Sequence, residues 1–189
     1  MKNLVLQMLE KLVDDSKREG LRETPHRVAE AYNFWTSGYA QEPAEVLKVF
    51  EDGASNYDQL VFQGGIPIYS LCEHHLVPFF GVVHVGYIPQ GKIVGLSKLS
   101  RLVDVFARRL QVQERITTQI VEVLENELKP LGVGVVIRCR HLCMESRGVQ
   151  KLGTITYTSA LKGEFKDSDS ARAEFMRLVS LADSHSGSI

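Results

Sequence analysis

The sequence has few cysteines, no long apolar run and no excess of charge of either sign. Its three cysteines, an odd number in 189 residues, do not suit a disulfide framework, so we expect free thiols that bind a metal or take part in a reaction. No apolar run approaches the roughly 18 residues of a transmembrane helix. Gln7, Glu10 and Lys11 interrupt the apolar start that a secretion signal would need. We therefore expect a cytoplasmic protein that has no membrane partner.

The charge balance argues against another class of partner. The chain carries 22 basic and 23 acidic residues, a formal net charge of -1, so no positive field favours nucleic acid or a membrane surface. Any anionic ligand must therefore be bound by a local cluster of cations. With 44% hydrophobic residues and only 6 prolines, the chain is typical of a folded protein of one domain that buries a substantial core.

The spacing of apolar residues and the positions of Gly and Pro predict an order of helices and strands. The expected helices are 4–13, 27–35, 43–50, 99–106, 116–128 and 171–182. The expected strands are 59–62, 66–71, 81–87, 92–96, 133–139 and 154–161. Gly20 would close the first helix, and Thr24 would cap the second with Pro25 in its first position. Residues 183–189 are expected to form a disordered tail.

This order predicts an α+β fold, in which a mostly antiparallel sheet carries a pair of helices on one face. Residues 1–50 would form an N-terminal helical region, and residues 51–189 would form the region that contains the sheet. So small a sheet leaves open edges and one uncovered face. We therefore expect other subunits to close it, which makes the protein a homo-oligomer.

Two segments far apart in the sequence carry metal-binding side chains. Cys72 and His75 have Cys-x-x-His spacing directly after an expected strand, so a turn can aim both at one ion. An extended backbone would place Cys139, His141 and Cys143 on one face of a second strand. Zinc prefers nitrogen and sulfur ligands, and Cys72, His75 and Cys143 together would leave a fourth position for water, which is the catalytic pattern. A closed, structural site would need Cys139 or His141 as well.

The alternative interpretation is a structural zinc, or cysteines that are simply buried, because free cysteine is among the most buried residue types. The histidines favour catalysis. His74 and His141 each flank an expected ligand without being needed as one, and imidazole both accepts and donates a proton near neutral pH. His84, His26 and His185 are expected to be structural.

The charge balance changes around these motifs. From Lys98 to Lys151 there are ten Lys and Arg against six Asp and Glu, which favours an anionic ligand. Lys98 and Arg101 lie one turn apart at the start of an expected helix, where backbone N–H groups also favour phosphate. Arg147 follows Cys143 by four residues. A solvated helix face remains the alternative for these cations, and Glu114 could be an ordinary helix-start carboxylate.

Five motifs, in the same order along the chain, resemble those of a known family. They are Cys72 to His75, Gly95 to Arg101, Gln111 to Arg115, His141 to Met144, and Thr158 to Ala160. The sequence resembles GTP cyclohydrolase I from about residue 20 to residue 178. This resemblance implies a T-fold, subunits joined into a toroidal decamer, and conversion of GTP and water to formate and 7,8-dihydroneopterin triphosphate. That reaction is the first step of folate and related pterin synthesis.

The resemblance also implies a role for each matching residue. Cys72, His75 and Cys143 would bind zinc, and His74 and His141 would transfer protons. The substrate-binding residues would be Gln113 and Glu114 for guanine, and Ser97, Lys98, Arg101, Arg147 and Arg27 for the triphosphate. Arg27 would reach a neighbouring subunit's site.

Two positions depart from the family's commoner pattern. Many members carry a basic residue where this chain has Glu30, and an apolar residue where it has Glu145. Both substitutions add negative charge near residues of the motifs. If either side chain faced the triphosphate, it would weaken nucleotide binding without changing the chemistry.

Two other functions are compatible with parts of this pattern. The T-fold nitrile reductase of queuosine synthesis also binds a purine-like base through a glutamate, but it needs a nucleophilic cysteine and NADPH, whereas the Cys/His spacing here favours zinc. A non-catalytic, zinc-stabilised nucleotide-binding assembly is the other. The presence of both His74 and His141 argues against it.

Overall fold

The computed structural model describes residues 1–13, 15–51 and 57–185. Its central feature is a five-stranded sheet in the order β5-β2-β3-β6-β7. The strands are β2 (Val61–Cys72), β3 (Pro78–Ile88), β5 (Leu110–Gln111), β6 (Gly132–His141) and β7 (Ile155–Gly163). All neighbours are antiparallel except the short parallel pairing of β5 with the end of β2. β1 (Val49–Phe50) and β4 (Ile93–Val94) form a separate antiparallel pair.

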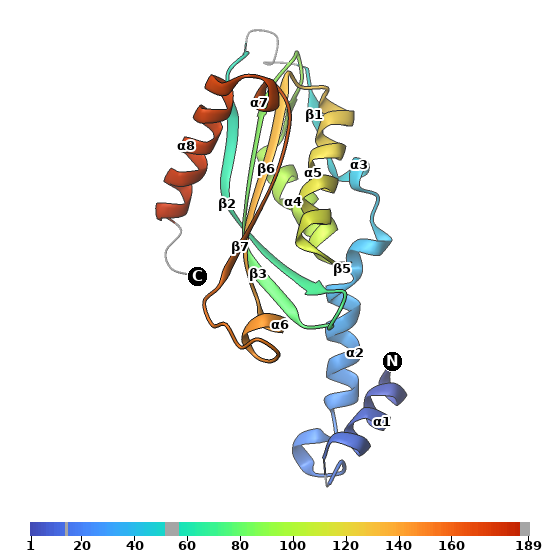
Figure 1. Ribbon diagram of the computed structural model, residues 1–189. Coiled ribbons are helices and arrows are strands. Elements are labelled where there is room, and N and C mark those ends of the chain that lie inside the picture. Colours follow the sequence, from blue (N-terminus) through green and yellow to red (C-terminus); the bar gives the residue numbers. More distant parts are fainter. Residues whose placement is uncertain (14, 52–56, 186–189) are drawn as a thin grey trace.

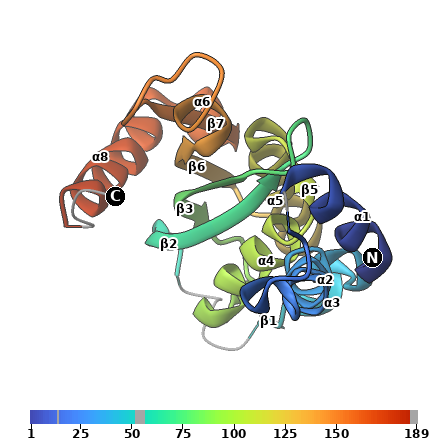
Figure 2. The ribbon, with the colours of Figure 1, turned by 90° about the horizontal axis from the view of Figure 1, so that it is seen from below.

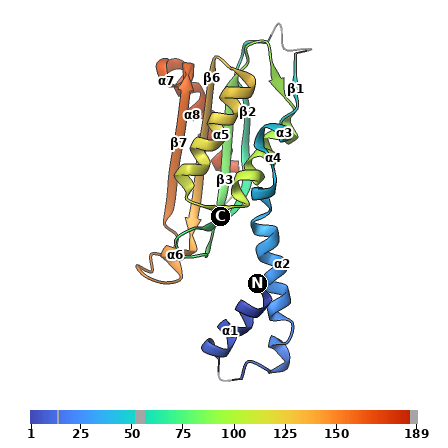
Figure 3. The ribbon, with the colours of Figure 1, turned by 90° about the vertical axis from the view of Figure 1, so that its right-hand side faces the viewer.

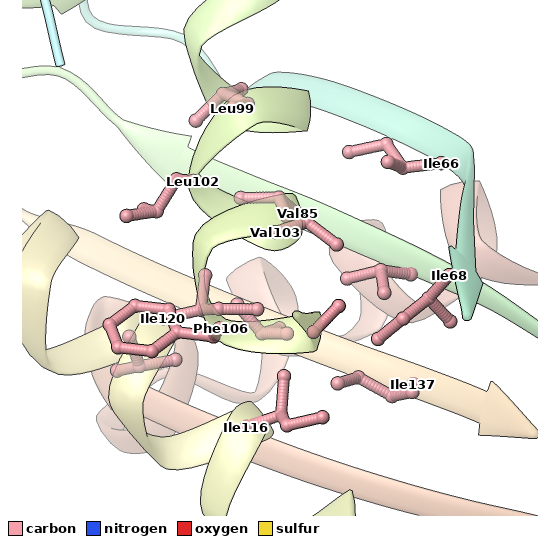
Figure 4. Packing of buried hydrophobic residues seen from close by; sticks show 14 of the residues in the cluster. Ile66, Ile68, Val85, Leu99, Leu102, Val103, Phe106, Ile116, Ile120 and Ile137 are labelled. Atoms are coloured by element: carbon pink, nitrogen blue, oxygen red, sulfur yellow. The ribbon is translucent and has the colours of Figure 1, made fainter. Parts of the chain in front are cut away.

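One face of the sheet is covered by α4 (Leu96–Ala107) and α5 (Gln113–Leu128), as the sequence predicts (Figures 1 and 3). Their apolar residues recur at helical spacing, so each helix turns one stripe towards the strands. In the core, Leu102 and Phe106 of α4 and Ile120 of α5 lie against Ile68 and Ile137 of the sheet (Figure 4). Burying such a side chain contributes roughly 1.5 to 3 kcal/mol. Packing of this core holds the first turns of α5 against one end of the sheet.

The opposite face carries α7 (Glu164–Asp167) and α8 (Asp169–His185), so the expectation of an uncovered face is wrong for this part of the sheet (Figure 3). Phe165, Phe175 and Val179 pack there against Val136 of β6 in a second apolar cluster. α8 also extends past residue 182, where the sequence predicts that the last helix ends. Asp183 is helical and pairs with Arg138, rather than belonging to a disordered tail. Residues 186–189 of that predicted tail lie outside the described residues.

The N-terminal segment consists of α1 (Lys2–Leu12), η1 (Glu19–Leu21), α2 (Thr24–Trp35), η2 (Ser37–Ala40) and α3 (Pro43–Val46). α1 and α2 pack against each other and extend beyond one end of the sheet, on the side of α4 and α5 (Figures 1 and 2). The N–H of Gly38 donates to the carbonyl of Arg108, which ties this segment to the end of α4. In the described part of the chain, none of the helices is both long and apolar enough to cross a membrane.

Several predicted boundaries need correction. The expected strands 59–62 and 66–71 form one strand, β2, which continues through a register shift between Gln63 and Ile66. The expected helix 43–50 ends at Val46, and the expected strand 92–96 is shortened to β4 because α4 begins at Leu96. Gly20 lies in η1, after α1 has already ended. Thr24 is the first residue of α2 and makes no capping hydrogen bond to it.

Candidate active site

The first half of the site is the tight turn between β2 and β3. Cys72 is the last residue of β2; its N–H donates to the carbonyl of Val77 at 3.0 Å, and its own carbonyl accepts the N–H of Leu76 at 2.8 Å. Leu76 has φ 53°, a left-handed conformation that a β-carbon makes unfavourable. The backbone therefore folds tightly enough to bring Cys72 and His75 to the same ion-binding position.

The second half comes from the end of β6. The strand ends at His141, which lies opposite Phe79 of β3, and the short helix α6 (Leu142–Glu145) follows at once. Cys143 is therefore helical, and the expectation of one extended face for Cys139, His141 and Cys143 is wrong. Cys139 instead points into the core, where burial raises the pKa of its thiol to about 12.

The two halves meet at a group of three possible metal ligands. One ligand atom each from Cys72, His75 and Cys143 lies within 4.8 Å of the others. Burial, and then the neighbouring Cys72 thiol, raise the pKa of Cys143. Two such close thiols are hard to ionise together unless a cation lies between them. Within the described residues, neither Cys139 nor His141 joins the group, so its ligands fit a metal ion that keeps an open position.

The two histidines that were predicted to transfer protons lie beside this group. His74 is largely exposed, with Nδ1 3.9 Å from the sulfur of Cys72. His141 stacks on Phe79 with ring centroids 4.7 Å apart, and burial lowers the pKa of its imidazole. Both rings line one cavity of about 240 Å³ that also contains the metal-binding group.

Gln113 at the start of α5 holds His141 in place. Its amide nitrogen donates to the carbonyls of Ile137 and Thr156, both at 3.0 Å, and to the hydroxyl of Thr158 at 3.1 Å. This turns its Oε1 towards His141 Nε2, 2.9 Å away. Because an amide oxygen only accepts, Nε2 is the protonated nitrogen of the neutral ring. Both ends of the Gln113 side-chain amide thus have partners within the chain, and its predicted contact with guanine stays a prediction.

Glu114 is the next residue of α5, and it is exposed. Its carboxylate lines the same cavity and acts electrostatically on His141, favouring the protonated ring. A single chain therefore brings together the three possible metal ligands, both histidines, Gln113 and Glu114.

The predicted triphosphate contacts are more scattered. Lys98 and Arg101 line a separate cavity beside α4, and Arg27 lines another at the far end of α2. Ser97 is exposed in the first turn of α4. Only Arg147 acts on the metal-binding group, through its charge on Cys143. One chain thus leaves most of these cations apart from the histidines.

Two ion pairs at the site were not predicted, since nothing in the sequence spacing signals them. Arg140 makes two hydrogen bonds to Glu145, at 2.8 and 2.6 Å, so the unusual carboxylate at this position is neutralised by its own neighbour. Arg115 makes a similar pair with Glu73. Glu30, the other unusual residue, lies 3.2 Å from His26 on the surface of α2.

Comparison with known proteins identifies the family. Residues 1–180 match the family model described as GTP cyclohydrolase I, and the chain belongs to that family. The resemblance inferred from the five motifs is confirmed.

The similar proteins include curated bacterial relatives. The chain is 60% identical over 172 residues to GTP cyclohydrolase 1 of Janthinobacterium sp. (strain Marseille), covering 91% of this chain and 87% of that one. It is 54% identical over 178 residues to the enzyme of the same name from Nitrosospira multiformis, covering 94% and 92%. A solved structure of an archaeosine synthase QueF-like protein in the apo form has a TM-score of 0.45 and 21% identity, over 55% of this chain and 93% of that one.

Proposed function

We propose that the protein hydrolyses GTP to formate and 7,8-dihydroneopterin triphosphate, the first step of folate and tetrahydropterin synthesis. Membership of the family supports this reaction. The observation that carries it is one cavity lined by the metal-binding group, two histidines and the carboxylate of Glu114. Thiol ligands of this kind stay reduced in a cytoplasmic compartment, where we place the enzyme.

We propose Zn²⁺ as the metal, held by Cys72, His75 and Cys143. Two sulfurs and one imidazole nitrogen are donors that zinc prefers, and three protein ligands match the pattern of catalytic sites. When bound, zinc supplies the Lewis acidity that makes water a nucleophile near neutral pH.

The chain's own residues then orient the substrate and move protons. The carboxylate of Glu114 accepts hydrogen bonds from N1–H and the exocyclic amine of guanine. Protonation of guanine N7 by His74 or His141 makes C8 electrophilic towards water. Because Nε2 of His141 is held by Gln113, Nδ1 is the atom of that ring which exchanges a proton. A second hydrolytic step releases formate, and the opened ribose closes again onto the freed amine to form the pterin ring.

The triphosphate is bound, in this proposal, by Ser97, Lys98, Arg101, Arg147 and Arg27, with a neighbouring subunit completing each site. The separate cavity of Lys98 and Arg101 supports shared sites. β7 and most of β2 lie at the edges of the sheet within the described residues, which supports closure by further copies. We propose a toroidal decamer of T-fold subunits, each with a helical region 1–50 and a catalytic region 51–189. The number ten rests on the resemblance alone.

The test is incubation of the purified protein with GTP. Formate and pterin fluorescence should appear together, and removal of the metal with a chelator should abolish both until Zn²⁺ is restored. Product formation that survives complete metal removal would contradict the zinc assignment. GTP binding without formate release would favour the non-catalytic assembly, and consumption of NADPH with a nitrile substrate would favour the reductase.

A further inference from the structure

We propose that Arg115 and Glu73 act as a positioning pair, which fixes the base-recognition end of the site at a set distance from the metal-binding end. This inference rests on the proposed function. Neither side chain is assigned to the metal, to proton transfer or to GTP. Each instead lies next to residues that are: Glu73 between Cys72 and His74, and Arg115 directly after Glu114.

The pair joins two separate elements. Arg115 Nη1 lies 2.6 Å from Glu73 Oε2, and Nη2 lies 3.0 Å from Oε1. This parallel, two-bond geometry fixes both distance and orientation, which a single ion pair does not. It connects the turn after β2 to the first turn of α5. A backbone bond runs alongside, from the N–H of Glu73 to the carbonyl of Gln111 at 3.0 Å.

The reaction requires that connection to be rigid. Guanine bound at Glu114 places C8 at a distance from the carboxylate that the purine ring itself fixes. The turn that carries Cys72, His74 and His75 must therefore stay at a matching distance from α5. Displacement of a reacting group by about 1 Å can cost as much as a hundredfold in rate.

Arg115 also pairs with the carboxylate of Glu73, which would otherwise compete with the substrate for His74. Glu73 Oε1 lies 3.9 Å from His74 Nε2, so a Glu73 released by Arg115 is close enough to accept a hydrogen bond from that imidazole. It would then hold the imidazole away from the substrate. Pairing with Arg115 keeps His74 available for proton transfer.

The pair contributes too little to the stability of the fold for stability alone to explain its presence. The side chains of Arg115 and Glu73 remain 43% and 31% exposed, and ion pairs of that exposure contribute at most about 1 kcal/mol. Lys162 and Glu125 form a matched pair, 40% and 42% exposed, which joins α5 to β7. If pairs of this kind served only to fasten α5, both would have the same effect on activity.

A double-variant cycle on the zinc-loaded enzyme tests the proposal, using Arg115→Met, Glu73→Gln and both together, with Lys162→Met as the matched control. Each single variant should lower kcat for GTP by about tenfold or more, with a smaller change in KM. The double variant should be no worse than the worse single variant, because both changes remove one interaction. The urea midpoint of each should equal that of Lys162→Met, which should keep wild-type activity.

A second measurement needs no GTP and follows the transfer of zinc from the protein to a chromogenic chelator. Transfer should be faster in both single variants than in Lys162→Met, because the turn that carries Cys72 and His75 is less restrained. The proposal is overturned if kcat stays within twofold of wild type, if the two effects multiply, or if the loss follows the urea midpoint. An inactive wild type would instead refute the proposed function. The rate of zinc transfer would then decide the role of the pair alone.

Discussion

At the scale of single residues, the two cysteines near the end of β6 lie in different environments. Cys143 lies within the metal-binding group, whereas Cys139 is buried in the core. We expect Cys143→Ser to lower zinc affinity by at least about tenfold, because a hydroxyl is a poor substitute for a thiolate ligand. Metal analysis after dialysis checks this. Cys139→Ser is the control and should retain one zinc per chain; full occupancy in Cys143→Ser would refute the ligand assignment.

The choice of base should depend on Glu114. Its carboxylate can accept both N1–H and the exocyclic amine of guanine, and adenine lacks this pair of donors. Glu114→Gln should therefore lower kcat/KM for GTP by at least about tenfold, because an amide cannot accept two such bonds through two oxygens. Turnover of GTP and ITP measures the effect, since inosine already lacks the amine. Equal use of both by the wild type, together with an unimpaired variant, would mean that Glu114 only begins a helix.

Residue types and spacing were enough to select Cys72, His75 and Cys143 as possible metal ligands, because ligand chemistry restricts which side chains can serve, but they left Cys139 and His141 as alternatives. The structure brings the first three together without the other two. The role of Gln113 in holding His141 could not be predicted. It depends on carbonyls of β6 and β7 that approach the amide only after the sheet has formed. The pairing of Arg115 with Glu73 was hidden for the same reason, because 42 residues separate the partners.

At the scale of secondary structure, the position of the site depends on the close pairing of β3 with β6. Gly81 lies opposite Cys139, and a β-carbon there would come within 1.8 Å of the carbonyl of Arg138. Gly81→Ala must therefore push the two strands apart. We expect a loss of about 1 to 3 kcal/mol in the free energy of unfolding, measured in urea, and faster loss of zinc. Gly20→Ala, where the added carbon meets nothing within 4 Å, is the control; equal stability of the two variants would contradict this account.

The docking of α8 should depend on pH through His84. This histidine is buried; its Nδ1 accepts the N–H of Gly65, and its Nε2 donates to Asp183, which also pairs with Arg138. Burial lowers the pKa of His84, so the unfolded chain binds a proton more readily than the folded one. Stability should fall as the pH drops below about 6.5, by at most about 1.4 kcal/mol per pH unit.

Urea midpoints of the wild type and His84→Gln at pH 7.5 and 5.5 check this prediction. The variant should lose less stability between the two pH values than the wild type does, because glutamine does not titrate. The comparison cancels the contribution of the metal-binding histidine, which both proteins share. An equal drop in both proteins would show that protonation of His84 does not oppose folding.

Helical periodicity predicted α4 and α5 well because both helices turn a continuous apolar stripe to the sheet. For the strands, apolar runs bounded by glycines were used, and these divided β2 at Gly64 and Gly65. The strand in fact continues there through a register shift, which local patterning does not reveal. Helical periodicity also ended the last helix too early. Asp183 and its neighbours are polar in sequence, and their helix is stabilised by contacts with β3 and β6.

At the scale of the whole molecule, one chain holds the metal-binding group in one cavity and two of the predicted phosphate-binding cations, Lys98 and Arg101, in another. The sequence predicted both sets and a shared role for Arg27, but not the separation of Lys98 and Arg101 from the histidines, because distance along the chain says little about distance in the fold. An active enzyme must bring them to one substrate. Assembly of several copies achieves this if the cations of one subunit face the histidines of the next.

Mixing two inactive variants distinguishes shared sites from sites within one chain. Arg101→Ala should remove triphosphate binding, and His141→Ala should remove proton transfer, so each homo-oligomer should be nearly inactive. If each site takes one half from each of two neighbours, equal co-assembly leaves about one quarter of the sites with both halves intact. Formate release should then recover to about that fraction of the wild-type rate after joint refolding, and not after simple mixing of preformed oligomers. Refolded mixtures that gain no activity, although mass analysis shows mixed oligomers, would place both halves in one chain.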